Sequence, residues 1–165
     1  MVSSSSRKRQ RGATMVEMAI TLPLFLLLVF AIIEFALIIF TWSRAVEATR
    51  EGARYAIVND PVTDISSLDC SAVTSVSTTC DKGNCTALMK RMNNLYSDLD
   101  AANVTVNYGC SSTGFPGDPH PVREVSVSIS GQEYGLIVPG ILGLDSTLTL
   151  PGFTTTRVSE DLHSP

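Results

Sequence analysis

The sequence predicts an α+β protein in which a long N-terminal transmembrane helix continues into a small domain with a second helix and an antiparallel sheet. Three observations predict this fold. An apolar run of helical length lies near the start of the 165 residues, helical spacing returns at residues 86–99, and two alternating apolar runs follow. The chain therefore divides into a leader at 1–12, a helix at 13–58 and a domain at 59–165.

The leader is basic, whereas the remainder of the chain is acidic. The net charge of the chain is −4, and the four basic residues of the leader precede all 16 acidic residues. These basic residues are Arg7, Lys8, Arg9 and Arg11. A basic tip suits the cytoplasmic face of a membrane. The acidic body argues against nucleic acid as the main partner. We therefore expect membrane lipid, and no nucleic acid, among the partners.

The membrane helix is predicted from its length and composition. Residues 18–33 carry no charge, and apolar character resumes after Glu34 as far as Trp42. As a helix, residues 18–42 reach about 37 Å, which is enough to cross a hydrocarbon core of about 30 Å. The alternatives are a buried core helix and a cleaved secretory signal. A domain this small would struggle to cover the apolar side chains, and no A-x-A-like site closes the run.

Two residues within the span are unusual. Pro23 removes one helical hydrogen bond, so a kink or local loosening is expected there. Glu34 places an ionisable group in the bilayer, which costs on the order of 2.5–3.5 kcal/mol, and such groups usually face a protein partner. The alternative is a carboxyl that is protonated or that reaches the interface.

All four cysteines follow the apolar run, which is the distribution expected if only that part of the chain enters an oxidising compartment; they are Cys70, Cys80, Cys85 and Cys110. Three disulfide pairings are possible, and the sequence does not choose among them. A zinc site is the alternative, but only Cys80 and Cys85 have a ligand-like spacing. Because Arg44, Arg50 and Arg54 nearly balance the leader's bases, the cysteines decide the orientation, with the N-terminus in the cytoplasm.

The junction between leader and helix reads R-K-R-Q-R-G-A-T-M-V-E. This stretch resembles a type IV prepilin leader, and residues 11–58 are similar to the TadE-like minor pseudopilins of tight-adherence (Tad) pili. The resemblance implies a pilin-like fold and cleavage by a prepilin peptidase between Gly12 and Ala13. It also implies a role for Glu17, at the fifth mature position, in assembly with other Tad pilins, pseudopilins and inner-membrane pilus machinery.

The chemistry of this junction can be stated independently. Cleavage after Gly12 would remove the leader's bases and leave a new α-amine on Ala13, with a pKa near 7.7–8.0. The Glu17 carboxylate of one subunit could pair with the amine of its neighbour, because an unpaired buried charge costs several kcal/mol. Glu34 is the second candidate for such assembly contacts. The alternative is an ordinary single-pass protein in which Glu17 marks the headgroup boundary.

Beyond Trp42, helical spacing continues through a stripe of small residues, which comprises Ala45, Ala48, Thr49, Gly52, Ala53 and Ala56. Such a stripe lets another element approach the helix closely, and in a pilin-like fold that element would be the domain's own sheet. The alternative is an ordinary surface helix with modest packing. The other face is charged, and we expect ion pairs between Glu47 and Arg50 and between Glu51 and Arg54.

The domain elements follow from turn chemistry and spacing. Residues 59–61 end the long helix, and a Ser/Thr-rich loop extends to Thr79. A second helix at 86–99 has one apolar face of Leu88, Met92, Leu95 and Leu99. Alternation predicts one strand with Val104, Val106 and Tyr108 and another with Val125, Val127 and Ile129, separated by a loop at 113–121. A last strand is expected within 146–158, and residues 148–160 also resemble the closing strand of the TadE-like family.

The sequence favours assembly over catalysis. His120 and His163 lie in segments typical of loops, and no catalytic constellation, metal site or cofactor motif can be assembled. We expect a minor pseudopilin in a bacterial inner membrane, with its C-terminal domain periplasmic or extracellular. The alternatives are an unprocessed single-pass anchor that displays a partner- or ligand-binding domain, and a secreted enzyme released by cleavage beyond residue 42.

Overall fold

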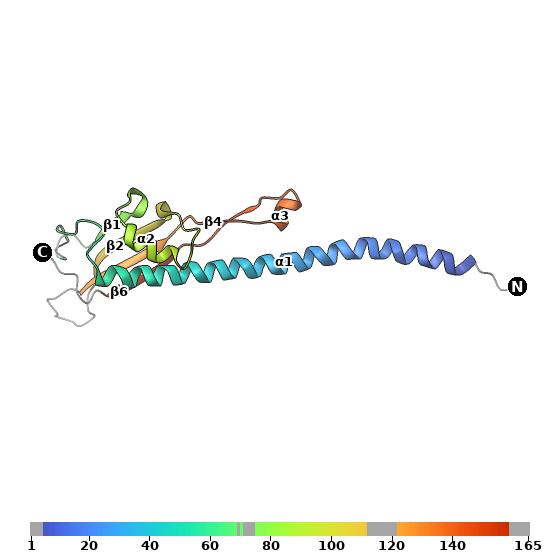
Figure 1. Cartoon of the computed structure of the whole chain (residues 1–165), viewed down its shortest axis with the longest axis horizontal. Coiled ribbons are helices and arrows are strands. Elements are labelled where there is room, and N and C mark those ends of the chain that lie inside the picture. Colours follow the sequence, from blue (N-terminus) through green and yellow to red (C-terminus); the bar gives the residue numbers. More distant parts are fainter. Residues whose placement is uncertain (1–4, 69, 71–74, 112–121, 159–165) are drawn as a thin grey trace. The chain divides into compact units, whose positions relative to one another are not determined.

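The structure is a computed structural model and describes residues 5–68, 70, 75–111 and 122–158. It confirms an α+β fold, with one long helix, a shorter second helix and an antiparallel sheet (Figure 1). The described chain forms two compact units. One contains the residues up to Ile39 together with 135–147, and the other contains 40–134 together with the residues from Leu148 onward.

The long helix α1 runs from Ser5 to Val58 and remains helical through Pro23. It ends where the sequence predicts. The amide side chain of Asn59 donates a hydrogen bond to the carbonyl of Tyr55 at 2.8 Å, which satisfies one of the free carbonyls of the last turn. Pro61 follows shortly afterwards and cannot continue a helix.

The main sheet has four antiparallel strands in the order β1-β2-β3-β6. The strands are β1 (Ser75–Thr79), β2 (Val104–Ser111), β3 (Val122–Ile129) and β6 (Phe153–Val158). The alternating residues predicted for β2 and β3 are buried, and Val106 lies opposite Val127 in the register. One face of the central strands therefore forms the core.

The Ser/Thr-rich stretch up to Thr79 is not entirely a loop, because its last five residues form β1. None of the β1 residues is buried, so the strand has no apolar alternation by which the sequence could reveal it. Its pairing with β2 holds it at the edge of the sheet. The predicted loop at 113–121 lies outside the described residues.

The second helix, α2, spans Thr86–Asn93 and is shorter than predicted. It ends early because the N–H groups of Leu95 and Tyr96 both donate to the carbonyl of Met92, at 3.0 Å, and close a turn. The prediction that Leu95 lies on the buried face is wrong, since this side chain is 38% exposed. Short 3₁₀ helices, η1 (Cys80–Lys82) and η2 (Ala101–Asn103), flank this region.

A hairpin interrupts the chain between β3 and β6. Its strands β4 (Glu133–Gly135) and β5 (Thr147–Thr149) form a two-stranded sheet, and the four-residue helix α3 (Val138–Ile141) lies between them (Figure 1). The predicted last strand thus corresponds to two strands, β5 and β6, with Pro151 between them. Residues 135–147 of this hairpin belong to the same compact unit as the first part of α1.

Candidate assembly site

The three residues of the processing and assembly motif lie near the start of α1 and are exposed. Ala13 and Glu17 are four positions apart and therefore share one face of the helix. Outside its own helix, Gly12 has no atom within 4 Å of where a Cβ would stand. The Thr21 hydroxyl donates to the Glu17 backbone carbonyl at 2.8 Å, which is local to the helix. The Glu17 carboxylate is thus placed on an open surface.

Most apolar side chains of α1 from Met15 to Trp42 are exposed. The most apolar 18-residue window of residues 12–58 has a mean hydropathy of 2.9, and only 6% of that window is buried within the structure. A core helix of a soluble domain would be covered on at least one face. Among the described helices, α1 is the one that is long and apolar enough to cross a membrane.

Glu34 differs from its neighbours because only 8% of its surface is exposed. Its carboxylate accepts hydrogen bonds from the backbone N–H groups of Ile137 and Val138, the latter at 3.1 and 3.3 Å to the two oxygens. These are the first N–H groups of α3, which have no acceptor within that helix. The partner found for Glu34 therefore belongs to its own chain.

The small-residue stripe is buried along its whole length, which decides against an ordinary surface helix, the alternative that the sequence left open. At Gly52, an added Cβ would lie 2.8 Å from the Met92 sulfur and 3.4 Å from a methyl of Val127. Both α2 and β3 therefore approach the helix more closely than a larger residue would permit. The stripe is the surface on which the sheet rests.

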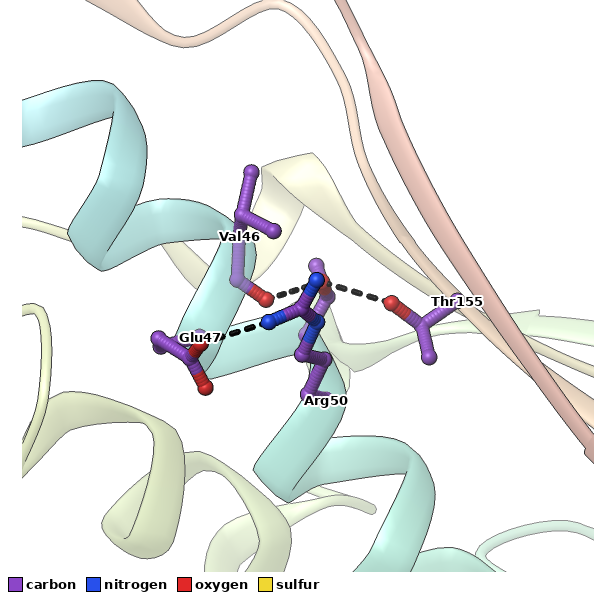
Figure 2. A network of polar contacts seen from close by, with 5 residues as sticks. Val46, Glu47, Arg50 and Thr155 are labelled. Carbon is purple, nitrogen blue, oxygen red and sulfur yellow. Dashed lines mark hydrogen bonds and ion pairs between the residues drawn. The ribbon is translucent and has the colours of Figure 1, made fainter. Parts of the chain in front are cut away.

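Thr49 adds a polar contact to this apolar interface. Its hydroxyl donates to the Val46 carbonyl at 2.7 Å and lies 3.0 Å from the hydroxyl of Thr155 in β6 (Figure 2). Because the single Thr49 proton is directed to Val46, the Thr155 hydroxyl is the donor between the two threonines. The contact fixes the edge strand β6 against α1.

These features of α1 can be compared with known proteins. Residues 12–54 match the family model of TadE-like proteins. The match confirms that this part of the chain resembles TadE-like proteins. It covers the span, Glu34 and most of the stripe, and none of residues 59–165. No curated protein and no solved structure matches the chain.

The charged face of α1 is only partly as predicted. Arg50 forms an ion pair with Glu47 at 2.6 Å (Figure 2), but Glu51 pairs with Arg91 of α2, at 3.4 Å, rather than with Arg54. The Arg91 guanidinium also lies over the Tyr55 ring, 5.4 Å from its centroid. Exposed pairs such as these contribute little to stability. They form a polar side opposite the stripe.

Two disulfides hold the domain that follows α1. Cys70 pairs with Cys110 in β2, and Cys80 pairs with Cys85 across the turn before α2. No cysteine is free, so no thiolate remains for the zinc site considered above. The first bridge ties the segment after α1 to the sheet. The second closes a five-residue separation beside α2.

The residues described in the structure contain no group of three or more His, Cys, Asp or Glu side chains that could hold a metal ion. His120 and His163 lie outside the described residues. The sequence did not single out residues 134–144, which include the partner of Glu34. The signal that could have revealed them is an apolar run without charge between Glu133 and Asp145.

Proposed function

We propose that the protein is a minor pseudopilin that supports the assembly of Tad-type adhesive pili, after a prepilin peptidase removes residues 1–12. The observation that carries the proposal is the match to TadE-like proteins, which begins at Gly12 on a helix whose apolar side chains are exposed. Helices with this surface associate through van der Waals packing and polar contacts within the bilayer.

The residues around the junction support the processing step. Gly12 is exposed and helical, and glycine in a helix interior costs about 1 kcal/mol relative to alanine. Local opening of the helix, which a peptidase needs to reach the backbone, is therefore easier at this position. Cleavage would leave the Ala13 amine four residues from Glu17, at the mouth of a low-dielectric bundle. There an amine and a carboxylate from adjacent subunits would neutralise each other and fix the axial register.

The two disulfides support an orientation with residues 1–12 in the cytoplasm and the C-terminal domain outside it. In a bacterium this is the inner membrane, with the domain in the periplasm or on the fibre. Protease added to spheroplasts should digest residues 59–165 and spare the span. A domain that is protected until the membrane is dissolved would reverse this orientation.

The mass of the intact chain tests the function directly. The protein extracted from cells that contain the prepilin peptidase should lack residues 1–12 and begin at Ala13, whereas cells without the peptidase should yield the uncut chain. Gly12→Leu should also stay uncut, because the bulky side chain occupies the cleavage position. An intact N-terminus in the presence of active peptidase would support the unprocessed anchor instead.

A further inference from the structure

The hairpin tip, defined as residues 134–144, has the composition of a membrane segment rather than of a surface loop. Its sequence is YGLIVPGILGL, with no charged residue between Glu133 and Asp145. Four large apolar side chains of the tip are 53–79% exposed, namely Ile137, Ile141, Leu142 and Leu144. A contiguous exposed apolar patch of this kind marks an interaction surface.

The tip lies against the membrane helix. Residues 135–144 of the tip belong to the same compact unit as the first part of α1, and the Glu34 carboxylate accepts the N–H groups of Ile137 and Val138. Glu34 is ten residues before Arg44, the first charged residue after the span, which corresponds to about 15 Å along the helix axis. A segment that contacts Glu34 must therefore lie well below the surface of the bilayer.

The length of the hairpin agrees with that depth. From Glu133 to Val138 the chain has five residues, which reach about 17 Å when extended at roughly 3.3 Å each. Two charged residues mark the ends of these segments: Glu133 at the base of the hairpin and Arg44 at the end of the span. The lengths of chain that separate them from the contact at Glu34 are thus nearly equal. Both charges can remain in the headgroup region while the tip is in hydrocarbon.

Most backbone N–H groups of the tip have an acceptor, which favours entry into lipid, where each unsatisfied N–H group costs several kcal/mol. Leu136 donates to Ser146 at 2.6 Å, and Glu34 accepts from Ile137 and Val138. Pro139 has no N–H group. The N–H groups of Ile141, Leu142, Gly143 and Leu144 donate to carbonyls of residues 137–140.

We propose that residues 134–144 are a membrane-inserted hairpin. Its apolar side chains are covered by the acyl chains of the leaflet that surrounds residues 34–42 of α1. Glu34 is then a positioning residue, since it supplies the acceptors that the first turn of α3 lacks. The inference needs α1 to span a membrane, but it does not need cleavage after Gly12 or a role in pili.

Fluorescence quenching by brominated lipid tests this surface. The full chain would be reconstituted into phosphatidylcholine vesicles with bromine on the acyl chains, in a Trp42→Phe background that removes the one native tryptophan. Ile141→Trp and Leu144→Trp should each lose emission to the same extent as Phe25→Trp, a residue of the span that is 62% exposed. The matched control is Val158→Trp, an exposed apolar position in β6, which should keep its emission.

Quenching of Phe25→Trp without quenching of either hairpin variant would overturn the proposal, because protein rather than lipid would then cover the tip. If Phe25→Trp is also unquenched, the span itself is not in the bilayer, and the inference fails with it. A cut N-terminus with an unquenched tip would leave the pseudopilin proposal intact and reject the hairpin alone. Formation of both disulfides in each variant would verify that the domain has folded.

Discussion

The carboxylate of Glu34 accepts a hydrogen bond from the backbone N–H of Val138 at 3.1 Å, across 104 positions of the chain. An isolated carboxylate in the middle of an apolar helix would be costly. Here it meets the positive end of a short helix, whose first N–H groups need an acceptor. Each group therefore satisfies the other, and the contact joins the membrane helix to the hairpin.

Removing this acceptor should loosen the hairpin tip. Hydrogen bonds to charged groups contribute about 1.5–3 kcal/mol, so amide exchange at Ile137 and Val138 should accelerate roughly tenfold or more in Glu34→Ala. The measurement is hydrogen exchange by NMR on the full chain in detergent micelles. Glu34→Gln keeps one oxygen acceptor and should have a smaller effect. Glu51→Ala, which alters another acid of α1, should leave the tip unchanged, and equal acceleration there would remove the assigned role of Glu34.

If Glu17 acts in assembly, its removal should impair pilus assembly without affecting membrane insertion. Glu17→Ala should remain in the membrane fraction after alkaline extraction, because the apolar run of α1 is untouched. Pilus output should fall, since the Ala13 amine of the neighbouring subunit would lose its partner. Met18→Ala, at the adjacent exposed position of α1, is the control and should assemble normally. Normal pilus output from Glu17→Ala would count directly against the role.

The close approach at Gly52 predicts a steric effect on stability. Gly52→Leu should destabilise the domain by about 1–3 kcal/mol, because its side chain would collide with Met92 and Val127. Gly52→Ala should be milder, since the flexible thioether of Met92 can move aside. Urea unfolding followed by Trp42 fluorescence would measure both, because this ring packs 5.9 Å from Phe153. Arg54→Leu, on the exposed side of α1, should leave the midpoint nearly unchanged.

The two disulfides should contribute unequally to stability. The bridge between Cys70 and Cys110 closes 40 residues and should contribute about 4 kcal/mol by loop-closure entropy, against about 2 kcal/mol for the five-residue bridge between Cys80 and Cys85. Paired Cys→Ser variants can be compared in the same urea unfolding assay. A larger loss from the short bridge would mean that local packing beside α2, rather than chain entropy, dominates.

The buried phenol of Tyr108 should make the free energy of unfolding fall at alkaline pH. Burial raises the pKa of this phenol, whose oxygen accepts the N–H of Val62 at 3.0 Å. Its contribution is fully present below the unfolded pKa near 10 and is lost as the pH rises toward the folded value. Tyr108→Phe should therefore cost about 1–3 kcal/mol at pH 7, by leaving Val62 without an acceptor, but show a shallower alkaline decline.

Urea midpoints between pH 8 and pH 11 would check this prediction. Part of the decline should persist in Tyr108→Phe, because burial and the nearby charge of Asp98 also raise the pKa of Tyr96. An identical alkaline slope in the two proteins would exclude Tyr108 as its source.

The elements with strong periodicity were predictable from the sequence. The end of α1 follows from the residues after Val58, and the alternation of Val104, Val106 and Tyr108 gives β2 directly. The small-residue stripe marked the face of α1 on which a sheet could pack, although a surface helix remained the alternative. In each case one local pattern determines one structural outcome.

The elements that depend on distant contacts were not predictable in this way. The edge strand β1 is polar, so only its pairing with β2 distinguishes it from a loop. Tyr96 and Leu99 are buried beyond the end of α2, so helical spacing continues where the helix does not. The partner of Glu34 lies more than 100 positions away, and no local pattern connects Glu34 to residues 137–138.

The buried stripe from Ala45 to Ala56 also determines how the domain responds to mechanical load. Tension along the axis of α1 would slide the stripe across the sheet and α2, so its contacts are loaded together in shear instead of peeling one after another. The close fit at Gly52 and the threonine pair at Thr49 and Thr155 resist the same displacement. A domain attached in this way should detach from its helix at high force and in a single step.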